Sequence, residues 1–278
     1  MSTLVKILPG TGRETAGEAS GGGGAGTGGV RAARPLHQPA AGPPPRAGEE
    51  WAEALAGPAR AQVIREAAEA GLAEAQAVLG QMLLDGTEVA GDARAGFGWF
   101  MRAAAQEHVL ALNMVGRCYE LGWGVAPDPA RAADCYRVAA GRGLPEAMYN
   151  WATQLTLGRG VAADKAAALG WLRRAAATGY AKAENFVGSF HEDGWATPVD
   201  LLAAAQCYAR AAHGGDFRGC FNHARILVRK KRVREALRWV EQALALGTPR
   251  FREQVRDWLE GQGDAELRLR GVAAADRC

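Results

Sequence analysis

The chain has 278 residues, a formal net charge of +3 and a hydrophobic fraction of 48%. This charge does not indicate a polyanion-binding protein, and no apolar run approaches the roughly 20 residues that a membrane-spanning helix needs. The N-terminal sequence MSTLVKILPG is too short an apolar stretch for a signal peptide. Five cysteines without a repeated spacing favour reduced thiols over a disulfide framework. We therefore expect a cytoplasmic protein.

Residues 1–48 are dominated by glycine, alanine and proline. They carry too few large apolar side chains to offset the entropy of ordering, so we predict a disordered tail. The glycine run at 21–24 is not a phosphate-binding loop, because no strand precedes it and no Gly-Lys-Ser/Thr follows it. A start of translation further downstream is an open alternative.

Helical periodicity begins at Trp51, where apolar residues start to recur at spacings of three and four, and this predicts a leading capping helix. An interval of 36 residues then governs the chain. It relates Asp92, Asp128, Asp164 and Asp200; Gly71, Glu107, Gly143, Gly179 and Gly215; and the alanine pairs that start at Ala103, Ala139, Ala175 and Ala211. Four copies without slippage are typical of a stacked repeat protein.

Each repeat predicts two helices joined by a short loop. Gly122 is expected to cap the first helix in the left-handed conformation, and Asp128 to cap the start of the second, with Pro129 at its first position. We predict an all-α solenoid over residues 49–262. Its repeats are expected at about 70–105, 106–141, 142–177, 178–213 and 214–246, with residues 263–278 as a C-terminal tail.

The fifth copy departs from the pattern. Its loop is shorter, and Arg229-Lys230-Lys231-Arg232 stands where Gly-x-Gly-Val is expected. Its second helix is predicted at 235–245, and a final amphipathic helix at 251–259. Atypical terminal copies are typical of a capped solenoid.

One stretch carries a specific motif: Ala111-x-x-x-Val-Gly-x-x-Tyr-x-x-Gly-x-Gly-Val-x-x-Asp128, followed by Arg131-Ala132, Tyr136 and Ala139-Ala140. It resembles the Sel1-like repeat, a relative of the tetratricopeptide repeat, strongly over residues 70–213 and loosely over 214–246. The resemblance implies a right-handed superhelix that recruits other proteins in bacteria. Thr87-Glu88 and Trp195-Ala196-Thr197 depart from the motif, so we expect those two loops to be shaped differently.

Catalytic chemistry finds little support. Ser189 is the only serine within the predicted folded region and lacks the surroundings of a hydrolase nucleophile. His191 and His223 occupy core registers, and we expect each to make one hydrogen bond there. The alternative is a metal site in which Cys220 and His223 join Cys207 or His191. We expect no enzyme activity and no cofactor.

The resemblance implies that the first helix of each pair lines the concave wall. The inward positions are then Ala77 and Gln81; Asn113, Arg117 and Glu120; Tyr149, Thr153 and Thr156; Asn185, Ser189 and Glu192; Phe221 and Arg225. Amide, hydroxyl and aromatic groups in such a row suit an extended peptide. The alternative is a solvated polar face.

Two further features suggest contacts with a partner. Trp123 and Trp195 share a loop position and are either interface anchors or rings that lie over a neighbouring loop. Residues 218–238 contain eight basic residues against one acidic residue. This charge fits a solvated cap or an acidic partner better than nucleic acid, because no aromatic residues interleave it. Our hypothesis is a non-enzymatic scaffold that binds a protein segment in its groove.

Overall fold

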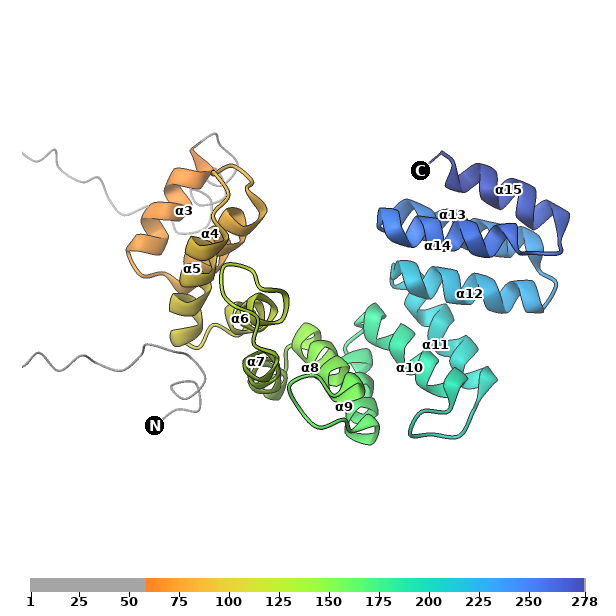
Figure 1. Ribbon diagram of the computed structural model, residues 1–278, viewed down its shortest axis with the longest axis horizontal. Helices are drawn as coiled ribbons and strands as arrows, with labels where there is room; N and C mark the ends of the chain where they lie inside the picture. The colour runs from red at the N-terminus through yellow and green to blue at the C-terminus, as the bar shows by residue number, and fades with distance from the viewer. Residues whose placement is uncertain (1–58, 278) are drawn as a thin grey trace, which may run out of the picture.

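The computed structural model describes residues 59–277, and every regular element in this range is an α-helix (Figure 1). The helices are α3 (Arg60–Glu69), α4 (Ala73–Asp85), α5 (Ala93–Ala105), α6 (Val109–Leu121), α7 (Pro129–Gly141), α8 (Pro145–Leu157), α9 (Lys165–Ala177), α10 (Ala181–Asp193), α11 (Leu201–His213), α12 (Phe217–Arg229), α13 (Val233–Leu246), α14 (Pro249–Glu260) and α15 (Ala265–Ala275). The predicted tail at 1–48 and the start of the leading helix at Trp51 lie outside the described residues.

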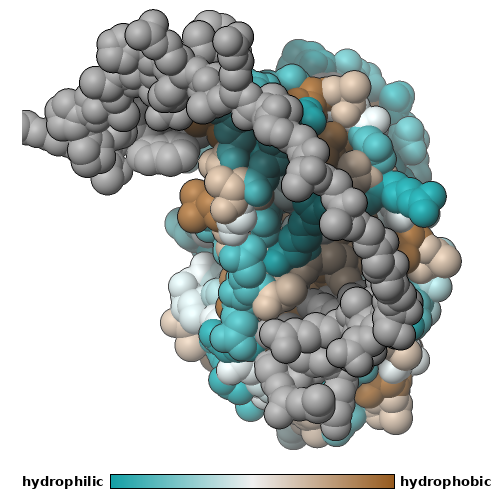
Figure 2. Space-filling model, turned by 90° about the vertical axis from the view of Figure 1, so that its left-hand side faces the viewer, coloured by the Kyte–Doolittle hydropathy of each residue, from teal (hydrophilic) through white to brown (hydrophobic). Residues whose placement is uncertain are grey.

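The helices stack in chain order into an arc, with α3 at one end and α15 at the other (Figure 1). Each helix packs on the next one along the chain, and α10 also contacts α12. The predicted α-solenoid is therefore confirmed. Figure 2 views the end that lies on the left in Figure 1, where hydrophilic residues predominate and hydrophobic residues form separate patches.

The helix caps follow the predicted registers. The first helices of the first four repeats each end at a glycine in the left-handed conformation, as Gly122 does with φ 74°. The second helices each begin at an aspartate, and the Asp128 carboxylate accepts a hydrogen bond from the Arg131 amide. The other pairs are Gly86 and Asp92, Gly158 and Asp164, and Gly194 and Asp200. Because each cap satisfies backbone groups within a few residues, local sequence suffices to fix the helix ends.

The two loops that depart from the motif keep its backbone. Glu88 has φ 62° and Ala196 has φ 54°, close to the 69° of Gly124 and 68° of Gly160. The expectation that these loops are shaped differently is therefore wrong at the position of Glu88 and Ala196, where the backbone is left-handed as in the other two loops. The capped helix ends impose the left-handed turn, although a side chain there costs about 1–2 kcal/mol relative to glycine.

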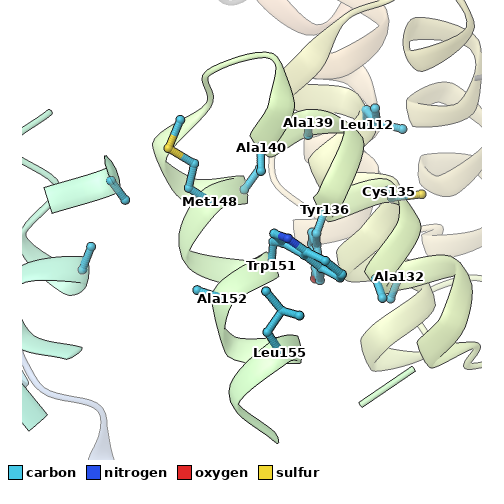
Figure 3. Close-up of a cluster of buried hydrophobic side chains, with 14 of the residues drawn as sticks. Leu112, Ala132, Cys135, Tyr136, Ala139, Ala140, Met148, Trp151, Ala152 and Leu155 are labelled. Atoms are coloured by element: carbon cyan, nitrogen blue, oxygen red, sulfur yellow. The ribbon is translucent and has the colours of Figure 1, made fainter. Parts of the chain in front are cut away.

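Size compensation between paired helices shapes the core. Gly116 on α6 faces Tyr136 on α7 so closely that a Cβ at this glycine would lie 2.7 Å from the ring. Gly80 with Phe100 and Gly188 with Tyr208 repeat this packing. In the third repeat the glycine register holds Ala152 and the aromatic register holds the smaller Leu172. Figure 3 shows Tyr136 of α7 and Trp151 of α8 in one buried cluster, together with Leu155 and Ala152 of α8. The glycine or alanine therefore sets the size of the side chain that faces it.

The C-terminal end differs from the prediction. Residues 263–278 were expected to form a tail, but α15 occupies most of them and packs on α13 and α14. Leu267, Gly271 and Ala274 are buried on its inner face, and Asp264 caps its start. A stripe of three mostly small residues is too weak a sequence signal to predict this helix. Within residues 59–277, no helix has the length and apolar character to span a membrane.

Candidate functional site

Four of the predicted inward positions line one pocket between α4 and α6. They are Ala77, Gln81, Asn113 and Arg117. The pocket has a volume of about 340 Å³, and its wall includes the apolar side chains of Val78 and Met114. Glu74 of α4 and Glu146 of α8 add carboxylates to its lining. The first helices of successive repeats thus form a hollow that combines apolar surface with a few polar groups, as binding sites commonly do.

The predicted asparagines link neighbouring repeats. Asn113 is only 6% exposed, and its Oδ1 accepts a hydrogen bond of 3.0 Å from Nδ2 of Asn150. Asn185 is 9% exposed and accepts a hydrogen bond of 2.9 Å from Asn222 in the same geometry. Each bond joins one first helix to the next. Both amides therefore hold adjacent first helices together.

A second kind of polar link occurs twice, between residues whose pairing the sequence analysis missed. The Tyr136 hydroxyl donates to Glu120 at 2.7 Å, and the Tyr208 hydroxyl donates to Glu192 at the same distance. The next repeat completes each link, because Gln154 donates to Glu120 and Arg225 donates to Glu192. A 72-residue interval relates Glu120 to Glu192 and Tyr136 to Tyr208, although Gln154 and Arg225 lie 71 residues apart. The same interval relates Asn113 to Asn185 and Trp123 to Trp195. This doubled period is the sequence signal that could have revealed the pairing.

Electrostatics around the link of Glu192, Tyr208 and Arg225 favour the ionised form of Glu192. Its burial opposes the charge, but the hydrogen bond from Tyr208 and the guanidinium groups of Arg225 and Arg229 lower the pKa of Glu192 below its ordinary value. Burial, together with the carboxylate partner, raises the pKa of Tyr208. The link therefore consists of a carboxylate, a neutral phenol and two guanidinium groups.

The aromatic groups lie partly against their neighbours. Tyr149 is half-buried, and its ring contacts those of Tyr180 and Phe186 with centroids 5.9 and 6.0 Å away. Trp123 is half-buried below the Arg117 guanidinium, which lies 4.8 Å from the ring centroid. The structure places both predicted loop tryptophans in this way, since Trp195 packs edge-on against Phe190 and beside Lys165.

The hydroxyl groups predicted on the wall bond to backbone. Thr153 Oγ1 donates to the carbonyl oxygen of Tyr149 at 2.9 Å, and Ser189 Oγ donates to that of Asn185 at 3.4 Å. Ser189 also accepts a hydrogen bond from the Tyr208 hydroxyl at 3.4 Å. These two side chains thus have part of their hydrogen-bonding capacity occupied within the repeat.

The histidines and cysteines do not converge. Among residues 59–277, no group of three or more histidine, cysteine or acidic side chains is placed to hold a metal ion. Nδ1 of His191 and Nδ1 of His223 are buried without a hydrogen-bond partner in the described range, so the expected bond is not seen at either atom. His223 instead packs edge-on against Trp239 at 5.4 Å. Burial raises the pKa of Cys220 to about 11, which leaves its thiol protonated.

The basic segment is partly paired. Arg225 and Arg229 bond to Glu192, and Arg232 pairs with Glu235. Lys230 and Lys231 are exposed, and neither forms an ion pair within the described part of the chain. Arg218, Arg234 and Arg238 are likewise exposed and form no ion pair in this range, so the exposed positive charge extends from α12 through the turn onto α13.

Solved structures of other proteins resemble this fold. A solved Sel1 repeat protein from Oxalobacter formigenes is 24% identical, with a TM-score of 0.65 over 75% of this chain and 89% of that chain. A protective antigen of uropathogenic Escherichia coli that displays an SLR fold is 26% identical, with a TM-score of 0.63. That match covers 78% of this chain but 48% of the antigen, so this chain spans about half of its length. An immunity protein from Pseudomonas aeruginosa is 15% identical, with a TM-score of 0.52 over 74% of this chain and 81% of its own.

The family model of the Sel1 repeat matches four consecutive segments. They are residues 73–108, 109–144, 145–180 and 181–216. Each segment has the predicted 36-residue length and contains one of the four pairs from α4 to α11. The matches cover more than half of the chain and end before the shortened fifth copy, so this chain belongs to the Sel1 repeat family.

Proposed function

We propose that this protein is a non-enzymatic scaffold that binds an extended protein segment along the row of first helices. The observation that carries the proposal is the pocket of about 340 Å³ between α4 and α6, where Asn113 and Arg117 meet apolar wall residues. Sel1 repeat solenoids are commonly protein-interaction scaffolds, which supports this assignment. An apolar side chain of the partner would enter the pocket while its backbone bonds to polar groups at the rim.

The proposed site residues fall into three groups by their exposure and their existing contacts. Arg117, Tyr149 and Arg225 are half-exposed and offer a guanidinium, a phenol and a second guanidinium along the row. Asn113 and Asn185 are buried links, and we assign them to holding adjacent helices in register. We propose Thr153, Ser189, Trp123 and Trp195 as secondary contacts, because each already bonds to or packs on the repeat itself.

The test fills the pocket instead of removing its links, since changing the asparagines would also weaken contacts between repeats. A partner is first identified by cross-linking in the native host. Its affinity is then measured by calorimetry for the wild type, for Ala77→Trp in the pocket, and for Ala166→Trp on an exposed face of α9. We expect Ala77→Trp to abolish binding and Ala166→Trp to leave it unchanged. Full affinity of Ala77→Trp, with an intact helical spectrum, would refute the proposal.

The compartment is part of the proposal. Four cysteines in the described range are free and buried: Cys118, Cys135, Cys207 and Cys220. Free thiols suit a reducing compartment, and we infer that the protein acts in the cytoplasm. Fractionation of the native host tests this, and recovery of the protein outside the cytoplasmic fraction would contradict it.

A further inference from the structure

Between repeats, each loop covers the start of the preceding repeat's second helix. The contacts are Gly124 with Ala93, Gly160 with Pro129, and Trp195 with Lys165. A Cβ at Gly124 would lie only 2.0 Å from the carbonyl oxygen of Ala93, so this loop touches the helix start directly. Ala93, Pro129 and Lys165 are the first residues of α5, α7 and α9. The backbone contact of Gly124 with Ala93 thus recurs at Gly160 with Pro129, whereas in the third case the Trp195 ring lies against the Lys165 ammonium group.

The fourth repeat lacks this cover. The equivalent helix start is Leu201, the first residue of α11. The loop that would cover it is shortened to residues 230–232 between α12 and α13, whereas residues 122–128 join α6 to α7. Leu201 and Leu202 are 53% and 67% exposed, and Val199 just before them is 62% exposed. The positions equivalent to Leu202 in the other repeats are exposed too, but they hold Arg94, Ala130 and Ala166 and not a large apolar side chain. Adjacent large apolar side chains at this exposure mark an interaction surface.

The uncovered helix start forms a pocket with a basic rim. Leu201, Leu202 and Ala205 of α11 line it together with Ile226, Arg229 and Lys230, and its volume is about 290 Å³. The two charged side chains in this lining are both basic. Arg229 is 55% exposed and reaches Glu192 only at 3.4 Å, while Lys230 is exposed. The neighbouring Asp200 carboxylate caps the start of α11, where it accepts hydrogen bonds from the backbone amides of Leu202 and Ala203.

We propose that this open start of α11, defined by the six lining residues, is a second docking site for a partner segment that carries a large apolar side chain beside acidic residues. The apolar side chain would take the space that a repeat loop fills elsewhere in the solenoid. The flanking carboxylates would pair with Arg229 and Lys230. Charge complementarity selects an acidic segment over a basic one, and the apolar floor distinguishes the site from a purely electrostatic patch. The site is separate from the pocket between α4 and α6.

A displayed library of random peptides, selected on the full-length protein, provides the probe. Enriched peptides are synthesised with a fluorescent label and titrated by anisotropy against the wild type and two site variants, Leu202→Ser and Lys230→Glu. Leu269→Ser is the matched control, because Leu269 is 69% exposed on α15. Ala77→Trp serves as the control for the other pocket.

We expect enriched peptides to combine acidic residues with a large apolar residue. Each site variant should weaken their binding by about tenfold or more, because it removes apolar contact or reverses a charge. The two control variants should leave affinity unchanged, and added salt should weaken binding. The proposal is overturned if no such peptides are enriched, if they bind Leu202→Ser as tightly as the wild type, or if Ala77→Trp abolishes their binding. It is also overturned if sedimentation shows a dimer that Leu202→Ser dissociates, because a second copy would then occupy the site.

Discussion

Replacing Gly124 by alanine would drive a methyl group into the backbone of the preceding repeat. The new Cβ would lie 2.0 Å from the carbonyl oxygen of Ala93 and 2.7 Å from the amide nitrogen of Arg94. Both are backbone atoms and cannot move aside as a flexible side chain can. The loop would have to leave the start of α5, and the contact between the first two repeats would open.

Two effects add at Gly124. Its φ of 69° is left-handed, which costs a residue with a Cβ about 1–2 kcal/mol. The backbone collision adds an overpacking term of about 1–3 kcal/mol. We therefore expect Gly124→Ala to lower the free energy of unfolding by about 2–5 kcal/mol.

Two further glycines separate these effects. Gly143 has φ 94°, and an added Cβ would meet no atom within 4 Å, so Gly143→Ala should cost only the backbone term of about 1–2 kcal/mol. Gly170 lies within α9 with equally open surroundings and without a left-handed φ. Gly170→Ala should therefore stabilise the protein by about 0.5–1 kcal/mol.

The assay is chemical unfolding of the full chain, followed by circular dichroism. The expected order of stability is Gly170→Ala, wild type, Gly143→Ala and then Gly124→Ala. Ala196 has φ 54° at the equivalent position of the loop between α10 and α11, so a residue with a Cβ can adopt the left-handed backbone at this register. If Gly124→Ala and Gly143→Ala proved equally stable, the close approach of the loop to Ala93 would be refuted.

Three further predictions concern the core, the polar link and the C-terminal end. Gly116→Ala should destabilise the protein by about 1–3 kcal/mol through collision with Tyr136, and adding Tyr136→Leu should recover part of the loss, as in the natural pair of Ala152 and Leu172. A double variant no more stable than the single one in chemical unfolding would count against size compensation. Because the folded-state pKa of Glu192 is lowered, its ionised form stabilises the fold above its ordinary pKa of 4.5, and this contribution disappears as pH falls through the folded value. The stability difference between wild type and Glu192→Gln in urea titrations should accordingly stay constant down to the ordinary pKa of 4.5 and shrink as the pH falls below it, and a difference that does not change with pH would contradict the assignment. Deleting residues 262–278 should lower the melting temperature, since α15 buries Leu267, Gly271 and Ala274, and an unchanged melting curve would show that the helix adds nothing.

The sequence by itself determined the repeat length, the helix pairs and their ends. These features depend on bonds that close within a few residues, such as the cap from Asp128 to the Arg131 amide. The left-handed backbone is kept even where the motif glycine is replaced, as at Glu88 and Ala196. The sequence also located the row of mostly polar positions on the first helices, and four positions of this row, Ala77, Gln81, Asn113 and Arg117, line one pocket.

Only the tertiary structure decided what those polar groups do. Asn113 was predicted as a partner contact, yet its oxygen is bonded to Asn150, 37 residues away on the next first helix. Leu201 likewise lines a pocket that residues of α12 in the following repeat complete, and α15 is held by burial against two other helices. Contacts between repeats depend on the distance and angle at which helices stack, and those follow from the volumes of side chains that are far apart in sequence. A repeating pattern therefore specifies the unit, whereas the contacts and pockets between units follow from how the units stack.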